Sequence, residues 1–260
     1  MEPSTLDFGE GPAAVLLHGQ PGNGGDWLPV AERLRERMRV LAPDRPGYGA
    51  SGRGPAGIRA NAAALIDLLD RLEIESAVVV GHSLGTGVAL AAAIDHPRRV
   101  RALVLAAPVA PSIPPATLDR LLARRYPGAP AARLGFGIVG LGLTLPPLRR
   151  LAHAAVPSLS TDQIAITAAE WRAGAVWRSF HAEQRSLVAE LPSLTPALAS
   201  VAQRVTILYG TRDRITPPAH ARRLARDLPQ ARLVPADGAG HMLPQQRPEL
   251  IAEAIEGAAS

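Results

Sequence analysis

Residues 76–90 read SAVVVGHSLGTGVAL, and this stretch decides the fold that we expect. A β-branched run typical of a buried strand leads directly into Gly81-His82-Ser83-Leu84-Gly85, and an apolar run of helical length follows. The two glycines permit a tight turn and a close approach of neighbouring backbones. A G-x-S-x-G sequence between a strand and a helix therefore predicts that Ser83 projects from a strand end at a helix N-terminus, where free amide groups favour negative charge.

Short apolar runs and segments of helical periodicity alternate on both sides of this unit. The expected strands are 13–17, 39–42, 76–80, 101–106, 205–209 and 231–235. The expected helices are 26–37, 58–72, 84–95, 218–228 and 244–255. This alternation predicts an α/β fold with a mostly parallel sheet and helices on both of its faces.

One interval, residues 108–194, breaks the alternation. It contains no strand candidate and is rich in proline, glycine, arginine and amphipathic helix. Because it lies between two strand-helix units, we predict that residues 1–107 and 195–260 form one core domain and that residues 108–194 form a helical lid inserted into it.

Two later strands end in residues that suit an acid and a base. Thr211-Arg212-Asp213-Arg214 follows one of them, and Asp237-Gly238-Ala239-Gly240-His241 follows the next. The carboxyl ends of the strands of an open α/β sheet surround one crevice. We therefore predict that Ser83, Asp213 and His241 meet there as nucleophile, orienting acid and general base.

Asp237 is the rival acid, but its place four residues before the histidine in a glycine turn suits a loop-shaping role better. Acyl transfer also needs two backbone N–H groups to hold an oxyanion. Their positions indicate Leu84, after the nucleophile, and Gln20, in the turn HGQPG that ends strand 13–17. His18 of that turn and Asp44 of PDRPGYGAS are interpreted as structural.

Composition excludes several kinds of chemistry. All 28 basic residues are arginine, so a lysine Schiff base and the usual attachment of pyridoxal phosphate are excluded. The chain has no cysteine, which excludes disulfides, thiolate metal sites and a cysteine nucleophile. No histidine or carboxylate pattern has metal-ligand spacing, so we expect neither a metal nor a cofactor.

The formal net charge is +5, but the arginines are interleaved with acidic and apolar residues. We interpret most of them as solvated helix faces, with an anionic partner or surface as the alternative, and we expect no nucleic-acid partner. The N-terminus does not resemble a secretory signal, and no run of 18 apolar residues occurs. A cytoplasmic protein without stable membrane insertion is the expectation.

Five motifs together resemble the α/β-hydrolase superfamily, in particular its lidded esterases, lipases, lactonases and perhydrolase-like members. They are VLLHGQPG (15–22), PDRPGYGASG (43–52), VVVGHSLG (78–85), ILYGTRDRITPP (207–218) and GAGHMLPQQRPEL (238–250). The resemblance covers nearly all of the chain outside residues 108–194. It implies a catalytic core, a cap and a triad in the order Ser83, Asp213, His241.

Departures from the family argue against several of its activities. Dehalogenases and epoxide hydrolases resembling this chain carry aspartate at the position of Ser83, so dehalogenation and epoxide opening are disfavoured. Hydroxynitrile lyases of similar fold rely on a lysine, which this chain lacks. Gln20 stands where perhydrolase-like relatives tend to have an aromatic residue, which argues against perhydrolysis. The N-terminus leaves room for about one strand before His18-Gly19, where relatives often have two.

The resemblance therefore implies a cofactor-independent serine hydrolase of the carboxylesterase kind. The apolar run LGFGIVGLGLTLPPL (134–148) is explained first by packing against the core, and the alternative is an apolar ligand surface. On that alternative we expect an uncharged, moderately hydrophobic ester as the small-molecule substrate. Hydrolysis of a lactone or amide, acyl transfer, perhydrolysis or carbon–carbon bond cleavage on the same triad are alternatives. A ligand receptor that kept the fold without turnover is the alternative from another class.

Overall fold

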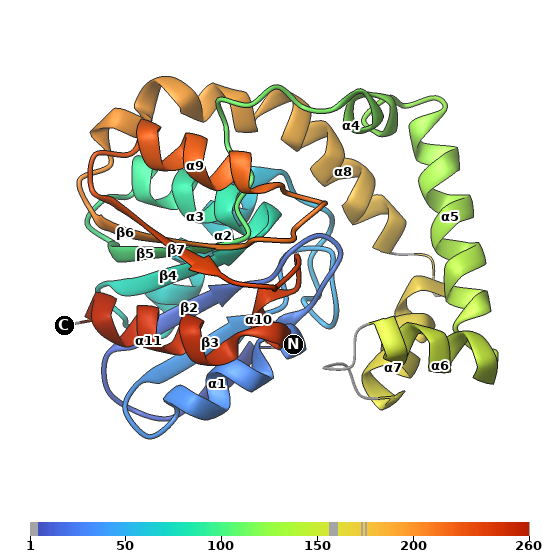
Figure 1. The fold of residues 1–260 in the computed structure, drawn as a ribbon, viewed down its shortest axis with the longest axis horizontal. Coiled ribbons are helices and arrows are strands. Elements are labelled where there is room, and N and C mark those ends of the chain that lie inside the picture. Colours follow the sequence, from blue (N-terminus) through green and yellow to red (C-terminus); the bar gives the residue numbers. More distant parts are fainter. Residues whose placement is uncertain (1–4, 156–160, 173, 175, 260) are drawn as a thin grey trace.

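The computed structural model describes residues 5–155, 161–172, 174 and 176–259. In this part of the chain seven strands form one sheet in the order β1-β3-β2-β4-β5-β6-β7 (Figure 1). Only β1 runs antiparallel to its neighbour, and the other pairings are parallel. The strands are β1 Thr5–Phe8, β2 Ala13–Leu17, β3 Arg39–Pro43, β4 Ala77–His82, β5 Val100–Ala106, β6 Arg204–Gly210 and β7 Ala231–Ala236.

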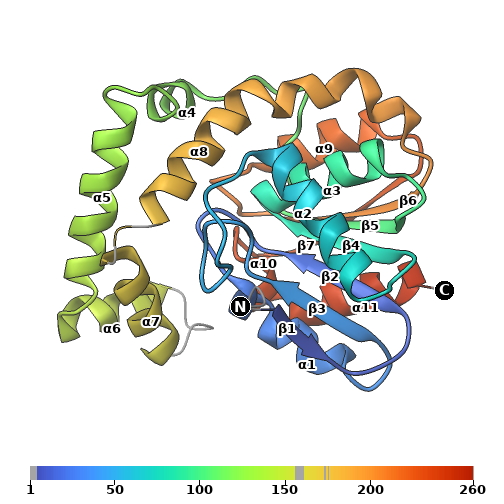
Figure 2. The same cartoon turned by 180° about the vertical axis from the view of Figure 1, so that it is seen from behind.

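Helices cover both faces of the sheet, as Figures 1 and 2 show from opposite sides. One face carries α2 Ile58–Arg71, α3 Leu84–Asp95 and α9 Pro218–Asp227, and the other carries α1 Leu28–Leu34 and α11 Pro248–Ala259, beside the short helices η1 Gly24–Trp27 and α10 Leu243–Gln246. The sequence prediction of a mostly parallel α/β sheet with helices on both faces is confirmed.

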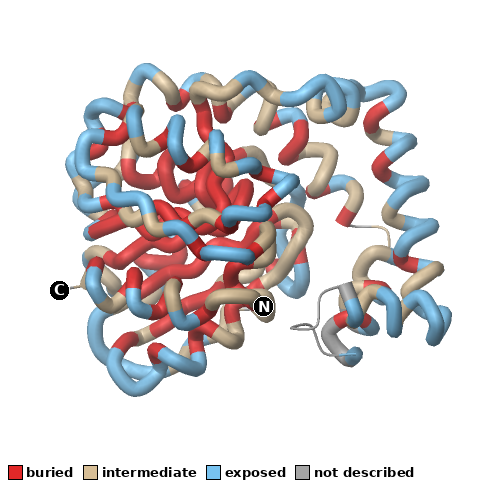
Figure 3. The backbone as a smooth tube through the Cα atoms, in the orientation of Figure 1, coloured by how far each residue is buried: buried red, intermediate tan, exposed pale blue. Residues whose placement is uncertain are grey.

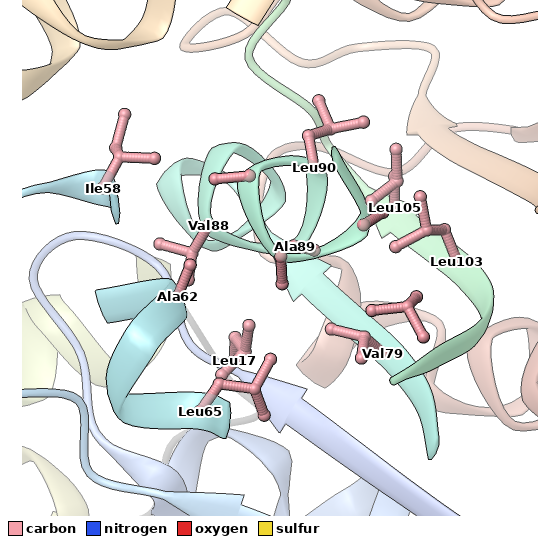
Figure 4. Close-up of a cluster of buried hydrophobic side chains, with 14 of the residues drawn as sticks. Leu17, Ile58, Ala62, Leu65, Val79, Val88, Ala89, Leu90, Leu103 and Leu105 are labelled. Atoms are coloured by element: carbon pink, nitrogen blue, oxygen red, sulfur yellow. The ribbon is translucent and has the colours of Figure 1, made fainter. Parts of the chain in front are cut away.

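Strand β4 shows why these residues build the centre of the molecule. Its valines are fully buried, with Val79 in the apolar cluster on one face and Val78 and Val80 in the cluster on the other. Successive side chains of a strand point to opposite faces, so a continuous β-branched run can fill both layers. Figure 4 shows α3 packed over this strand, with Val88 and Ala89 directed at α2 and the sheet.

The expectation of about one strand before His18-Gly19 is wrong, because β1 precedes β2 and forms the edge of the sheet, where it pairs antiparallel with β3. Its four residues hold only two that are strongly apolar, Leu6 and Phe8. A strand this short and half-buried gives almost no periodic signal in the sequence.

Between β5 and β6 the described residues form helices and no strand. They are α4 Thr117–Leu122, α5 Gly128–Gly142, α6 Pro146–Ala155, α7 Thr161–Arg172, α8 Val176–Ala189 and the 3-10 segment η2 Leu191–Ser200. Helices α5, α6 and α7 stand apart from the sheet, and α8 leads back to it (Figure 1). Most of α5 and α6 is exposed, in contrast to the buried sheet (Figure 3). A lid domain bounded by residues 108 and 194 stays a prediction.

Candidate active site

Ser83 occupies the turn between β4 and α3 with φ 51° and ψ −120°. This left-handed conformation is uncommon for a residue with a side chain, and strain of this kind concentrates at functional sites. The flanking glycines are required by space. A Cβ at Gly81 would lie 2.4 Å from the carbonyl oxygen of Gly85, and a Cβ at Gly85 would lie 2.4 Å from that of Leu17. The turn therefore holds its serine only with glycine on both sides.

Two other predicted residues, Asp213 and His241, meet beside this turn. Asp213 follows β6, His241 follows β7, and their Oδ2 and Nδ1 atoms are 2.8 Å apart. The rival Asp237 is exposed at the start of the same loop, so it is Asp213 that contacts the imidazole. A carboxylate at Nδ1 fixes the ring orientation and leaves Nε2 as the nitrogen able to take a proton.

Thr216 completes this pair and was missed by sequence reasoning. Its hydroxyl lies 2.9 Å from Asp213 Oδ2, 3.2 Å from His241 Nδ1 and 3.1 Å from the Ala107 carbonyl oxygen. The Ile215 and Thr216 N–H groups donate to Asp213 Oδ1 at 2.8 and 3.0 Å. An aspartate whose own turn supplies such donors is a recognisable local pattern, so the spacing in Asp-Arg-Ile-Thr could have signalled it.

The electrostatics of this pair favour an ionised acid. Burial alone would raise the pKa of Asp213, but the contact with His241 and the donors from Ile215 and Thr216 outweigh burial and lower that pKa. Asp213 thus stays anionic at neutral pH and can stabilise positive charge on the imidazole.

His82 ties the histidine loop to the serine turn. Its Nε2 atom lies 2.9 Å from the His241 carbonyl oxygen, and the two ring centroids are 4.9 Å apart. Burial, and then the proximity of His241, lower the pKa of His82 to about 3, so it stays neutral. No hydrogen bond joins Ser83 to His241 within the described residues, and catalytic hydrogen bonds often tighten only when substrate binds.

The predicted oxyanion donors Leu84 and Gln20 line the same cavity as Ser83. A Cβ at Gly19 would lie 3.2 Å from Ser83 Cβ, so the HG turn lies directly against the serine. The Gly19 carbonyl accepts hydrogen bonds from Arg45 Nη2 and His18 Nδ1, both at 2.8 Å. That carbonyl shares one planar peptide group with the Gln20 N–H, so these bonds fix the direction of the N–H.

His18 is neutral and structural, as its surroundings require. It is fully buried, and its pKa is lowered by burial first and by Arg45 second. Its Nε2 atom accepts the Arg45 backbone N–H at 3.0 Å, so its proton lies on Nδ1. Asp44 is also structural, since its carboxylate accepts the Gly24 and Ala50 N–H groups at 2.8 Å.

Arg45 links the HG turn to helix α8 through a buried ion pair. Its guanidinium contacts Glu183, and the two side chains are 2% and 1% exposed. Tyr48 donates to the second Glu183 oxygen at 2.6 Å, and Arg45 Nε donates to the His18 carbonyl at 2.9 Å. No local pattern could have revealed this pair, because 138 residues separate its members.

A cavity of about 640 Å³ opens beside Ser83. Its walls are mostly apolar, with a few polar groups, which is the usual composition of a small-molecule site. From the core the lining includes Gln20, Ser83, Leu84, Thr216 and His220, and from the segment between β5 and β6 it includes Ile113, Leu118, Leu122, Phe180, Gln184 and Leu187.

His220 also lines the cavity and accepts the Ala110 N–H at Nδ1, 3.2 Å away. One expectation about this cavity needs correction. The run 134–148 contributes nothing to its described walls. Leu134, Ile138 and Leu141 instead line a separate groove. Among the described residues, no group of three or more His, Asp or Glu side chains could hold a metal ion.

Comparisons with known proteins agree with the fold and the motifs. Residues 14–254 match the model of the alpha/beta hydrolase family. A pimeloyl-[acyl-carrier protein] methyl ester esterase of Chromobacterium violaceum is 34% identical over 260 aligned residues, covering 90% of this chain and 89% of the relative. A 2-hydroxymuconate semialdehyde hydrolase of Pseudomonas sp. is 44% identical over 115 residues, covering 42% of this chain and 40% of the relative.

A solved structure of similar fold is that of a thermophilic esterase from Thermogutta terrifontis. It superposes with a TM-score of 0.79 at 27% identity, covering 98% of this chain and 91% of the esterase.

Proposed function

Because the chain belongs to the alpha/beta hydrolase family, we propose that it is a serine hydrolase that cleaves a carboxylic ester of an uncharged, moderately hydrophobic substrate. The observation that carries the proposal is the 2.8 Å contact between His241 Nδ1 and Asp213 Oδ2 beside the strained turn of Ser83. The esterase names of two similar proteins support the choice of bond.

The reaction proceeds through a covalent acyl-enzyme. His241 Nε2 takes the proton of Ser83 Oγ as that oxygen attacks the ester carbonyl and forms a tetrahedral intermediate. The carbon–oxygen bond to the leaving group then breaks, and the imidazolium returns the proton to the departing alcohol. Water repeats these steps on the acyl-enzyme, releasing the acid and restoring Ser83. Asp213 stabilises the imidazolium in both halves.

The oxyanion is held by the N–H groups of Leu84 and Gln20. Leu84 is the first residue of α3, where the helix dipole also favours negative charge. The Gln20 N–H is fixed in direction by the bonds of Arg45 and His18 to the Gly19 carbonyl. Donors that are already oriented need no rearrangement as charge develops, which is the usual source of a large rate enhancement.

Substrate class follows from the cavity. Its volume of about 640 Å³ suits a small molecule, and aliphatic residues such as Ile113, Leu118 and Leu187 form much of its wall. The formal charges in the wall, Asp119 and Arg214, are of opposite sign. An uncharged acyl chain of moderate length therefore fits this lining better than an anion.

The test is hydrolysis of p-nitrophenyl esters of increasing chain length by the wild type and by Ser83→Ala. We expect turnover with a medium-chain optimum, and a fall in kcat on the order of a million-fold in the variant. Ser193→Ala, an exposed serine of η2, is the matched control and should keep full activity. Equal rates for wild type and Ser83→Ala would end the proposal and favour a ligand receptor.

Carbon–carbon bond hydrolysis is the second candidate, because 115 residues of the chain are 44% identical to the 2-hydroxymuconate semialdehyde hydrolase. The same triad serves either bond. Incubation with 2-hydroxymuconate semialdehyde distinguishes the two: if its consumption exceeds the best ester rate and Ser83→Ala abolishes it, carbon–carbon cleavage replaces the ester proposal.

A further inference from the structure

The segment between β5 and β6 carries exposed apolar side chains, most of which the catalytic proposal does not use. Of the twelve large apolar side chains that are exposed in the described part of the chain, ten lie between Leu118 and Leu151. Scattered exposed apolar residues are normal in soluble proteins, but a contiguous group marks an interaction site. We call six of them the α5–α6 stripe: Leu134, Ile138, Leu141, Leu145, Leu148 and Leu151.

Helix α5 is not amphipathic, because both of its sides are apolar. One side packs inward: Phe136 contacts Trp171 and Phe180 edge-on, with ring centroids 5.0 and 5.1 Å apart. The other side presents Leu134, Ile138 and Leu141, which are 61 to 65% exposed. Because the inner side already has its partners, the outer stripe is not needed to hold α5 in place.

The stretch of sequence that carries the stripe holds charge of one sign. Between Asp119 and Asp162 the sequence holds six arginines and no acidic residue. Arg125 and Arg133 line a groove of about 590 Å³ together with Leu134, Ile138 and Trp177. Within the described residues, neither Arg125 nor Arg133 takes part in an ion pair with a carboxylate.

The length and composition of α5 and α6 also bear on how they could contact a membrane. No single helix of the described residues is long and apolar enough to cross a membrane, but α5 and residues Pro146–Ala154 of α6 pass together by length and composition, with a bend of 102° between them. A bent pair whose apolar residues face outward suits a position along a bilayer surface better than a path through it.

We propose that the α5–α6 stripe, together with Arg125 and Arg133 of the groove and Arg149 and Arg150 of α6, docks this protein reversibly on an anionic lipid bilayer. Leucine and isoleucine side chains enter the boundary between headgroups and acyl chains, and the guanidinium groups bind the anionic headgroups. Trp177 lies at the edge of the groove, where an aromatic side chain suits the membrane interface. A second copy of the chain fits poorly, because pairing two such surfaces brings arginine against arginine.

Co-sedimentation of the full chain with vesicles tests the proposal. We expect binding to phosphatidylcholine mixed with phosphatidylglycerol, little binding to phosphatidylcholine alone, and loss of binding at high salt. Arg149→Gln with Arg150→Gln should weaken binding to the anionic vesicles roughly thirtyfold. Ile138→Gln with Leu141→Gln should weaken it by a similar factor. Arg222→Gln with Arg226→Gln on α9, and Leu233→Gln on β7, are matched controls that should bind like the wild type.

Tryptophan fluorescence locates the contact. Vesicles should shift the emission of the wild type to shorter wavelength, and Trp177→Phe should lose most of that shift while still sedimenting. Thermal melting followed by circular dichroism should be nearly the same for all variants, because the replaced side chains are exposed or, at Arg149 and Trp177, partly exposed. These assays need no ester, so their outcome is separate from that of the hydrolase test.

Three outcomes would overturn the proposal. The first is a wild type that stays in the supernatant with anionic vesicles. The second is binding that the apolar and arginine substitutions leave unchanged. The third is a wild type that is oligomeric by analytical ultracentrifugation and becomes monomeric with Ile138→Gln and Leu141→Gln, since a second copy would then cover the stripe.

Discussion

The sheet core and the arm formed by α5 and α6 are built from similar apolar residues with opposite fates. In the core, Leu103 and Val104 of β5 are fully buried between two helical layers. In the arm, Ile138 and Leu141 are 61% exposed. The difference teaches that hydrophobicity specifies burial only where a second layer exists to receive it. A sheet with helices on both sides supplies that layer, whereas α5 has packing partners only on its inner side among the described residues.

The comparison also separates the residues proposed to carry out the reaction from the segment that covers the substrate cavity. Every residue of the proposed triad and oxyanion hole belongs to the core, as does Arg45, which fixes the Gln20 peptide. Helix α8 connects the segment between β5 and β6, which includes the arm, to the core through the buried ion pair of Glu183 with Arg45. Changes in the core should therefore alter the reaction itself. Changes at α8 should alter how the segment between β5 and β6 sits on the core.

The largest expected effect tests whether the core carries the reaction. Asp213→Asn should lower kcat on the order of ten-thousand-fold, because an amide at this position favours the wrong imidazole tautomer. Asp237→Asn is the matched control, since that carboxylate is exposed and has no bond to the imidazole, and it should stay near wild-type activity. Ester hydrolysis at neutral pH measures both. Equal losses in the two variants would remove Asp213 from the mechanism.

The next prediction concerns the joint between α8 and the core, by which we mean the buried ion pair of Arg45 with Glu183. Glu183→Gln leaves the buried Arg45 guanidinium without its counter-charge, and we expect unfolding to become easier by about 3 to 5 kcal/mol. Urea denaturation measures this difference. Glu253→Gln on the exposed side of α11 should change the free energy of unfolding by less than about 0.5 kcal/mol.

A double variant distinguishes charge from packing at this joint. Replacing Arg45 and Glu183 together with methionine removes both buried charges, and such replacements commonly recover much of the loss caused by either one alone. The double variant should nevertheless lose kcat, because Arg45 no longer holds the Gly19 carbonyl. Full activity in the double variant would contradict the positioning of the oxyanion hole by Arg45.

The sequence predicted the core far better than the joint. Strand 13–17 and helix 84–95 have the predicted bounds, because each is a predominantly apolar stretch flanked by turn residues. Asp213 and His241 were found because strand ends in an open α/β sheet converge on one crevice. Glu183 and His220 were not found, since their roles depend on contacts made by residues more than 100 positions away. Local patterns carry no record of such pairings.

A matched pair of substitutions sharpens the comparison of burial. Leu103→Ala opens a cavity in the core and should cost about 2 to 5 kcal/mol of unfolding free energy. Ile138→Ala removes an exposed side chain of similar size, and we expect a change within about 0.5 kcal/mol. Chemical denaturation of both variants beside the wild type gives the two values. A large loss from Ile138→Ala would mean that the arm packs against something in solution.

A second contact joins the segment between β5 and β6 to the core, and its electrostatics differ from those of the Arg45–Glu183 pair. Helix α7 reaches the η1 turn through Glu170, which accepts a hydrogen bond from the Asn23 side chain. Burial raises the pKa of nearby Asp26 from 3.8 to about 7, against a hydrogen bond from the Asn23 N–H. The charges of Glu170 and Asp44 raise this pKa further, and Arg45 lowers it. Carboxylates thus oppose one another here, whereas Arg45 and Glu183 attract.

The smallest predicted effect is a pH dependence at this contact. Because the pKa of Asp26 is higher in the folded protein, about 7 against 3.8, its contribution to stability is fully present below pH 3.8 and is lost as pH rises to about 7. Asp26→Asn removes that slope, so the variant should become more stable than the wild type at pH 8 by roughly 1 to 2 kcal/mol, a figure discounted for partial exposure. Urea denaturation from pH 4 to pH 8 measures the difference. Parallel curves for the two proteins would show that Asp26 titrates normally, and the contrast between the two contacts would then rest on Arg45 and Glu183 alone.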